Sequence, residues 1–201
     1  MKLYYAPGAC SLAPHIVINE AGLKATLDKI NFQGGRTTES GRDYYEINPQ
    51  GSVPALELDN GEVLAEAQVL LQYLAEQAPE AQLAPHAGMA RWRLLETLNF
   101  IATELHKGIS PLFRKPAPEV REGIVKTVES RLALLEGKLG DKDYLIGDFS
   151  IADAYAFVTL RWAKGFGIDL GATPKLAAYF DRVRTRPAVQ TTLVQEGLPT
   201  T

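Results

Sequence analysis

The chain has 201 residues, of which 46% are hydrophobic and 22% are charged, so its composition is that of an ordinary globular protein with one large domain or two small ones. Its net charge is −3 and it contains no basic run, which argues against nucleic acid as a partner. The first residues lack the apolar run of a signal peptide, and Cys10 is the single cysteine. We therefore expect a cytoplasmic protein without a membrane partner, an intrachain disulfide or a metal site.

Strand and helix signals alternate in the first 80 residues. The β-forming residues 2–5 predict a strand, and apolar residues at helical spacing predict a helix from Leu12 to Gly22, where the glycine would end it. A weaker second strand is expected at 26–32. The polar, glycine-rich residues 33–43 predict a surface loop.

A hairpin and a further helix complete this half. The extended runs 53–58 and 62–64 flank Asn60-Gly61, a dipeptide that strongly favours a hairpin turn. A helix is predicted from Glu66 to Gln77. The order of these elements predicts a small α/β unit.

Only helices are predicted after Pro79. Apolar residues recur every three or four positions from Met89 to Ile109 and again from Val120 to Leu139, further helices are expected from Ser150 and near 174–185, and the boundary falls within 79–87. We therefore predict domains at 1–80 and 87–201.

The segment Pro7–Ser11 places a thiol and a hydroxyl where a strand turns into a helix. Free N–H groups and the helix dipole at such a place favour an anion, so a thiolate there would have a lowered pKa. Alternatively, Ser11 is an ordinary N-cap and Cys10 a small buried side chain.

Two further junctions carry candidate binding groups. Pro54 has no N–H to donate, so Val53-Pro54 is either the start of an edge strand or a cis bond that turns the N–H and C=O of Val53 outward. At the start of the helix from Glu66, the N–H of Ala67 can hold a carboxylate while Glu66 accepts from an ammonium. Alternatively, Glu66 only offsets the helix dipole.

A polar stripe follows the long helix. Asn99 and His106 are seven positions apart and Thr103 lies beside them, with Lys107 next in the chain. This arrangement favours stabilisation of an anion, although a single histidine on a helix is more often structural. Glu104 is expected on another surface.

The segment Ser150–Asp153 has the pattern of a capping box at the start of an apolar helix. We interpret it as structural.

Together these segments resemble the beta-class bacterial glutathione transferases. The resemblance rests on residues 1–12, 48–56, Glu66, 99–108 and 149–155, which occur in order along nearly the whole chain.

The resemblance implies a thioredoxin-like N-terminal domain, an all-helical C-terminal domain, a cis bond at Pro54 and a homodimer. Glutathione would be the co-substrate, bound in a cleft between the domains. Its cysteinyl backbone would pair with Val53 and its γ-glutamyl end would bind at Glu66 and Ala67.

The remaining assignments concern the sulfur and the partner subunit. The resemblance places Cys10 near the glutathione sulfur, where His106 and Lys107 approach it from the helical domain, and Glu104 near the ligand of the partner subunit. Asn99 and Thr103 complete the expected binding residues. We assign Cys10 or Ser11 as the donor to sulfur and His106 as its electrostatic or proton-transfer support.

Two positions depart from the family pattern. Many relatives have serine where this chain has Ala67, so only the backbone N–H remains to hold the carboxylate. Relatives also tend to have a lysine near position 35 that contacts the glycyl end, and Arg36 is the expected substitute.

The expected activity is conjugation of glutathione to a small hydrophobic electrophile, as in detoxification. The electrophile would contact Ile109, Phe113, Trp162 and Phe166, or these residues belong to the core. Alternatives are a Cys10-dependent thiol transferase, a dehalogenase or isomerase, and a non-catalytic binding protein.

Overall fold

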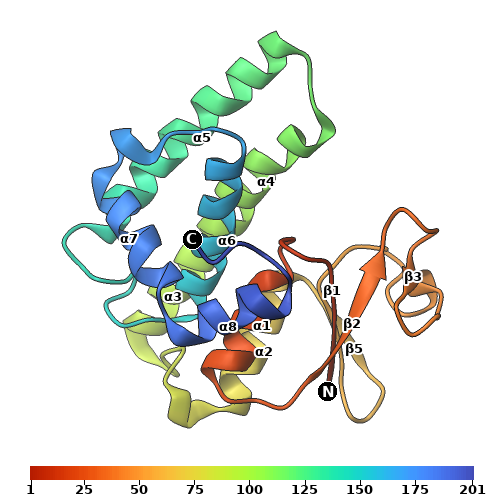
Figure 1. Cartoon of the computed structure of the whole chain (residues 1–201). Coiled ribbons are helices and arrows are strands. Elements are labelled where there is room, and N and C mark those ends of the chain that lie inside the picture. The colour runs from red at the N-terminus through yellow and green to blue at the C-terminus, as the bar shows by residue number, and fades with distance from the viewer. The chain divides into compact units, whose positions relative to one another are not determined.

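The computed structural model describes all 201 residues, which form two compact units (Figure 1). The first unit comprises Met1–Leu83 and Arg186–Thr201, and the second comprises Ala84–Thr185. The predicted ranges 1–80 and 87–201 differ from these units chiefly because the C-terminal segment belongs to the first unit.

The first unit is built on a five-stranded mixed sheet with helices packed against it. Its elements are β1 (Lys2–Tyr5), α1 (Leu12–Glu20), β2 (Thr26–Asn31), β3 (Thr37–Thr38), the short helix Tyr44–Glu46, β4 (Ala55–Glu57), β5 (Val63–Ala65), α2 (Ala67–Gln77), the short helix Pro79–Ala81 and α8 (Pro187–Gln195). The strand order is β3-β2-β1-β4-β5, with β1 and β2 parallel and the other neighbours antiparallel. This is the expected thioredoxin-like arrangement.

The hairpin prediction is confirmed. Leu56 lies opposite Leu64 in the register of β4 and β5, and the N–H of Leu58 donates to the carbonyl of Glu62 at 2.8 Å. Gly61 adopts a φ of 86°, which a glycine tolerates without a steric cost. The predicted loop 33–43, by contrast, contains β3, which is too short to leave a periodic signal.

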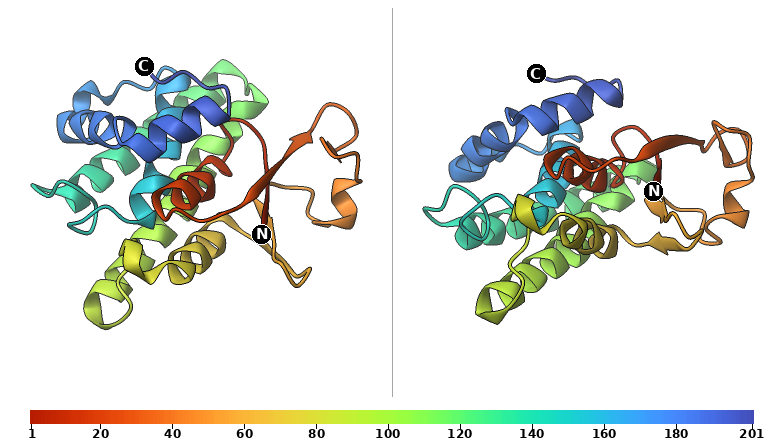
Figure 2. Two further views of the ribbon diagram at one scale, coloured as in Figure 1. Left: turned by 60° about the horizontal axis from the view of Figure 1, so that its bottom comes forward. Right: turned by 90° about the horizontal axis from the view of Figure 1, so that it is seen from below.

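The helix α8 was not predicted from the sequence. Its Val189 and Leu193 are buried, and α1 contacts both α2 and α8. The red α1 and the dark blue α8 lie side by side in both views of Figure 2. With nine residues, α8 presents too few apolar positions to establish a period.

The second unit is helical throughout. Its elements are α3 (Gly88–Phe100), a π-helical segment (Ile101–His106), α4 (Lys107–Ile109), the short helix Ser110–Arg114, α5 (Pro118–Leu139), α6 (Ile151–Gly165), the short helix Leu170–Ala172 and α7 (Pro174–Arg184). The predicted helix from Met89 to Ile109 is therefore interrupted by a π-helical segment. Met89 and Trp92, expected on its apolar face, are 67% and 64% exposed.

The predicted capping box at the start of α6 is present. Asp153 is fully buried, and its two oxygens accept four hydrogen bonds of 2.8–2.9 Å from the N–H of Leu145, the hydroxyl of Tyr179, and the N–H and hydroxyl of Ser150. Burial raises the pKa of this carboxyl, and the hydrogen bonds counteract that rise. The carboxyl anchors the start of α6 to the loop before it and to α7.

Candidate active site

The turn between β1 and α1 carries the candidate thiol. The N–H of Ala9 donates to the carbonyl of Ala6 at 3.0 Å, and Gly8 adopts a φ of 70°. The hydroxyl of Ser11 accepts from the N–H of Ala6 at 3.1 Å and donates to its carbonyl at 3.2 Å. Ser11 is also fully buried, and its hydroxyl closes the turn through these two hydrogen bonds.

Cys10 lies beside the start of β4. Its thiol, which is partly exposed, donates to the carbonyl of Val53 at 3.1 Å. The Val53–Pro54 bond is cis, as the resemblance implied. The preceding carbonyl, that of Ser52, accepts from the Tyr44 hydroxyl and the Asn48 amide, both at 2.8 Å. Two buried side chains thus hold this segment opposite the thiol.

A buried network links the same turn to the C-terminal segment, and sequence reasoning missed it. One oxygen of Glu196 lies 2.9 Å from Nδ1 of His15, and the other accepts from the N–H of Gly8 at 2.8 Å. The other ring nitrogen of His15 lies 2.8 Å from Oε1 of Gln195. The available signal was His15 itself, because a histidine within the apolar stretch of α1 requires buried polar partners.

The junction of β5 and α2 is a second candidate binding place. Glu66 is exposed and adopts φ 70° and ψ 116°, and its carbonyl accepts from the N–H groups of Val69 and Leu70 at 2.9 and 3.0 Å. The N–H of Ala67 lies in the first turn of the helix, where it has no partner within the helix. The arrangement suits a carboxylate at the N–H and an ammonium at the Glu66 side chain.

Arg36 is held at the edge of this unit. Its guanidinium donates to the carbonyl of Gly51 and lies 5.3 Å from the ring centres of both Phe32 and Tyr45. Gly51 adopts a φ of 61°, a left-handed conformation that favours glycine, and a Cβ atom there would also force the guanidinium to move. A guanidinium has five N–H donors, so one bond to Gly51 does not exhaust its capacity.

The π-helical segment positions the candidate groups of the helical unit. Because a π-helix has more residues per turn than an α-helix, the α-helical spacing that placed Asn99 and His106 on one stripe does not apply here. Asn99 and Thr103 are exposed, and the hydroxyl of Thr103 donates to the Asn99 carbonyl at 3.0 Å. Lys107 is also exposed.

His106 is partly buried in an aromatic surrounding. Its Nδ1 lies 2.6 Å from the hydroxyl of Tyr155, and its ring meets that of Trp162 edge-on at 5.0 Å. Burial, with a smaller contribution from Lys107, lowers the pKa of His106 to about 4. The imidazole is therefore neutral at pH 7 and can act through hydrogen bonding or proton transfer, but not as a standing positive charge.

Glu104 has a partner within its own chain. Its carboxylate accepts from Nε of Arg131 on α5 at 2.6 Å, with the two side chains 39% and 35% exposed. The sequence did not indicate this ion pair.

The residues expected around an electrophile divide into core and surface. Ile109 is fully buried and belongs to the core, whereas Phe113 is 54% exposed. The Phe113 ring meets Trp162 and Phe166 edge-on at 5.3 and 4.8 Å. The rings of Phe113, Trp162, Phe166 and His106 form a continuous series of contacts, and we call these four residues the aromatic cluster.

Two absences complete the description of the site. No group of three or more His, Cys, Asp or Glu side chains is placed to hold a metal ion. No helix has both the length and the hydrophobicity that crossing a membrane requires.

Comparison with known protein families identifies the class to which this fold and the turn at Cys10 belong. The N-terminal domain of glutathione S-transferases matches residues 8–77 and their C-terminal domain matches residues 100–187. The chain belongs to the glutathione S-transferase family.

Particular relatives agree along the whole chain. Glutathione S-transferase GstA of Escherichia coli O157:H7 is 45% identical, with 98% of this chain and 100% of the relative aligned. A sphingomonad glutathione S-transferase solved in complex with glutathione is 43% identical, with a TM-score of 0.93 over 99% of this chain and 100% of that chain. A beta-class enzyme of Sphingomonas chungbukensis is 42% identical, with the same TM-score and the same coverage.

Proposed function

We propose that the protein is a glutathione transferase that binds reduced glutathione, stabilises its thiolate and conjugates it to a small hydrophobic electrophile. One observation carries this proposal. Cys10 and Val53, which the family resemblance assigns to glutathione, are 43 positions apart in sequence, yet the thiol and the carbonyl lie 3.1 Å apart. The glutathione bound in the sphingomonad relative supports the same ligand for this chain.

The first unit would hold the tripeptide through its backbone. The carbonyl and N–H of Val53 would pair with the cysteinyl residue as an added strand does, and the thiol of Cys10 would leave that carbonyl when glutathione arrives. Glu66 and the N–H of Ala67 would bind the γ-glutamyl end, and Arg36 the glycyl carboxylate.

Thiolate stabilisation requires donors near the sulfur. A thiol with a pKa of ~8.5 is only a few per cent ionised at pH 7, and lowering that pKa by about two units would make the thiolate the majority species. We assign Cys10 as the nearest donor, with support from the start of α1. His106 would act as a neutral hydrogen-bond donor and Lys107 would supply the positive charge.

The roles of the remaining expected residues are also proposed from the family resemblance. The exposed part of the aromatic cluster would receive the electrophile, and Asn99 and Thr103 would contribute polar contacts. In a homodimer, Glu104 would serve the ligand of the partner subunit once released from Arg131. Cytoplasmic detoxification is the expected setting, which the single cysteine fits.

Calorimetry with reduced glutathione tests the proposal, with S-methylglutathione as the comparison ligand. We expect both to bind, the methylated ligand more weakly, and only the free thiol to release a proton. Glu66→Gln should weaken binding about tenfold, whereas Glu62→Gln on the exposed hairpin should leave it unchanged. No binding up to millimolar concentration would disprove the transferase activity while leaving the family membership intact.

A further inference from the structure

We propose that the rings of Phe32 and Tyr45 position Arg36 to recognise the free carboxylate at the glycyl end of glutathione, so that the protein selects the unmodified tripeptide over derivatives blocked at that end. This selection rests on the proposed function, since it concerns the same ligand. Phe32 and Tyr45 would be positioning residues, because they act on the ligand only through the guanidinium. All three residues belong to the first unit.

Two aromatic rings flank this single guanidinium. Cζ of Arg36 lies 5.3 Å from the ring centres of both Phe32 and Tyr45. The two aromatic residues are 42% and 47% exposed, so packing in the core does not account for their position. At such distances the electron-rich face of a ring attracts a cation, and Arg36 meets two of them. The rings therefore restrict the directions in which the guanidinium can point.

The backbone of Arg36 is also fixed, on both sides of the residue. Its N–H donates to the carbonyl of Asn31 at 3.1 Å, and its carbonyl accepts from the N–H of Tyr44 at 2.9 Å. Its φ is 58°, a left-handed conformation that residues other than glycine adopt uncommonly. Such a conformation persists only where the surrounding contacts determine it. The turn therefore places the Arg36 side chain in one region instead of leaving it to move freely.

The second ring is held by a short helix and by a close approach to Gly51. The N–H of Tyr45 donates to the carboxylate of Asp43, which caps the helix Tyr44–Glu46, at 2.9 Å. The guanidinium of Arg36 donates to the carbonyl of Gly51. An added Cβ at Gly51 would meet both the guanidinium and the Tyr45 ring, so glycine leaves room for both. Contacts within the chain thus order the long Arg36 side chain, and a ligand would not have to do so.

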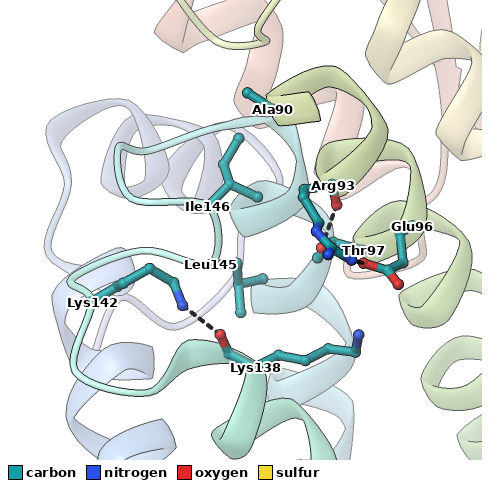
Figure 3. A pocket seen from close by; sticks show the side chains of 8 residues that line it. All are labelled: Ala90, Arg93, Glu96, Thr97, Lys138, Lys142, Leu145 and Ile146. Atoms are coloured by element: carbon teal, nitrogen blue, oxygen red, sulfur yellow. Dashed lines mark hydrogen bonds and ion pairs between the residues drawn. The ribbon is translucent and has the colours of Figure 1, made fainter. Parts of the chain in front are cut away.

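Arg36 keeps donors for an anion. Its bond to a backbone carbonyl uses one of the five N–H donors of a guanidinium. No carboxylate of the chain forms an ion pair with it, in contrast to Arg93 of the helical unit, whose partner Glu96 lies at 2.9 Å (Figure 3). A planar guanidinium matches the two oxygens of a carboxylate, whereas an ester or an amide lacks the charge. The group that fits is therefore a free terminal carboxylate.

Calorimetry with two ligands tests this selection. The ligands are reduced glutathione and its monoethyl ester, in which only the glycyl carboxylate is blocked, so the thiol and the γ-glutamyl end are the same in both. We expect the ester to bind about tenfold more weakly. In the double variant Phe32→Leu/Tyr45→Leu this preference should fall to about two- to threefold, because both rings are lost while apolar side chains remain. The two affinities are compared within one protein, so a general loss of stability does not produce this change.

Three further variants sharpen the test. Arg36→Gln should abolish the preference, which separates the charge of the glycyl end from the bulk of the ester. Phe32→Tyr/Tyr45→Phe exchanges the two rings and should retain the preference. Lys29→Gln removes an exposed cation of β2 and should also leave the preference unchanged.

The outcomes separate this selection from the proposed function. Equal binding of glutathione and its ester, or an undiminished preference in Phe32→Leu/Tyr45→Leu, would overturn the role of the two rings while leaving the transferase activity intact. If neither ligand binds, the proposed function and the selection both fail.

Discussion

Asp153 and Glu196 are both buried carboxylates that bind backbone N–H groups, but their partners lie at different distances along the chain. The backbone partners of Asp153 are Leu145 and Ser150, eight and three positions away, and its most distant partner, the hydroxyl of Tyr179, is 26 positions away. Glu196 binds Gly8 and His15, which are 188 and 181 positions away. The first carboxylate begins one helix, whereas the second holds the end of the chain against the turn that carries Cys10. The comparison separates what a local pattern encodes from what only the completed fold brings together.

The largest expected effect is on stability, from Asp153→Ala. The substitution leaves the N–H groups of Leu145 and Ser150 and the Tyr179 hydroxyl buried without their acceptor. We expect the free energy of unfolding to fall by about 3–5 kcal/mol, measured by urea denaturation.

The matched control for that experiment is Asp169→Ala. Asp169 also accepts from a backbone N–H at a helix start, that of Gly171 at 2.8 Å, but it is exposed. We expect it to cost no more than about 1 kcal/mol. Equal losses in the two variants would mean that burial does not give Asp153 its importance.

Glu196→Ala is expected to cost about 2–4 kcal/mol, because it leaves the buried His15 with Gln195 alone and removes the carboxylate that the partly buried N–H of Gly8 binds. It should also weaken glutathione binding several-fold, since Gly8 belongs to the turn before Cys10. Calorimetry and urea denaturation measure the two effects separately.

Glu20→Ala provides the control for the second effect. Glu20 also ties α1 to the start of α8, through Arg186 at 2.6 and 2.9 Å, but it does not touch the turn. We expect lower stability and unchanged glutathione binding. A parallel loss of binding in both variants would show that α8, and not the contact to Gly8, controls the site.

The sequence predicted the elements whose signals are local. The strand–turn–helix at Cys10, the Asn60-Gly61 hairpin and the capping box at Ser150 each depend on neighbours within a few positions, and the structure contains all three. The helix α8 was missed because its stability comes from packing on α1.

The interactions around the candidate groups were mostly beyond sequence reasoning. The partner of His106 is 49 positions away, and the π-helical segment that carries this histidine has no sequence signature. Ser11 was singled out because it lies beside Cys10, and the structure adds that its hydroxyl closes the turn through the backbone of Ala6. Adjacency in sequence predicts where a side chain lies better than what it binds.

His106 provides a pH-dependent test of such a long-range environment. Its pKa is about 4 in the folded protein and near 6.5 in the unfolded chain, so below pH 6.5 the unfolded state binds a proton that the folded state does not. The free energy of unfolding is therefore not reduced by this group above pH 6.5, and it falls by about 2–3 kcal/mol as the pH is lowered toward 4. His106→Gln should lose that much less stability between pH 7 and pH 4, as measured by thermal unfolding. Identical pH profiles would show that burial does not lower this pKa.

Tyr155→Phe tests whether the same contact also serves the reaction. Without the phenol, Nδ1 of His106 loses its partner at 2.6 Å and the ring is no longer held in one orientation. We expect kcat for conjugation to fall about tenfold with little change in the KM for glutathione. Tyr73→Phe on α2 controls for the loss of a phenol elsewhere, and a fall in kcat in that variant as well would make the effect non-specific.

Ala67→Ser should give the smallest effect and, unlike the others, a gain. Ala67 occupies the first position of α2, where its N–H is the only group it offers to a carboxylate. A hydroxyl at this position adds a second donor without altering the helix dipole, so we expect glutathione to bind about three- to tenfold more tightly in calorimetry. Gln68→Ser places a hydroxyl one position later and should have no such effect. Unlike Glu196 and His106, Ala67 would affect glutathione binding only through the helix start to which it belongs. An unchanged affinity would therefore mean that the γ-glutamyl carboxylate does not bind at this helix start.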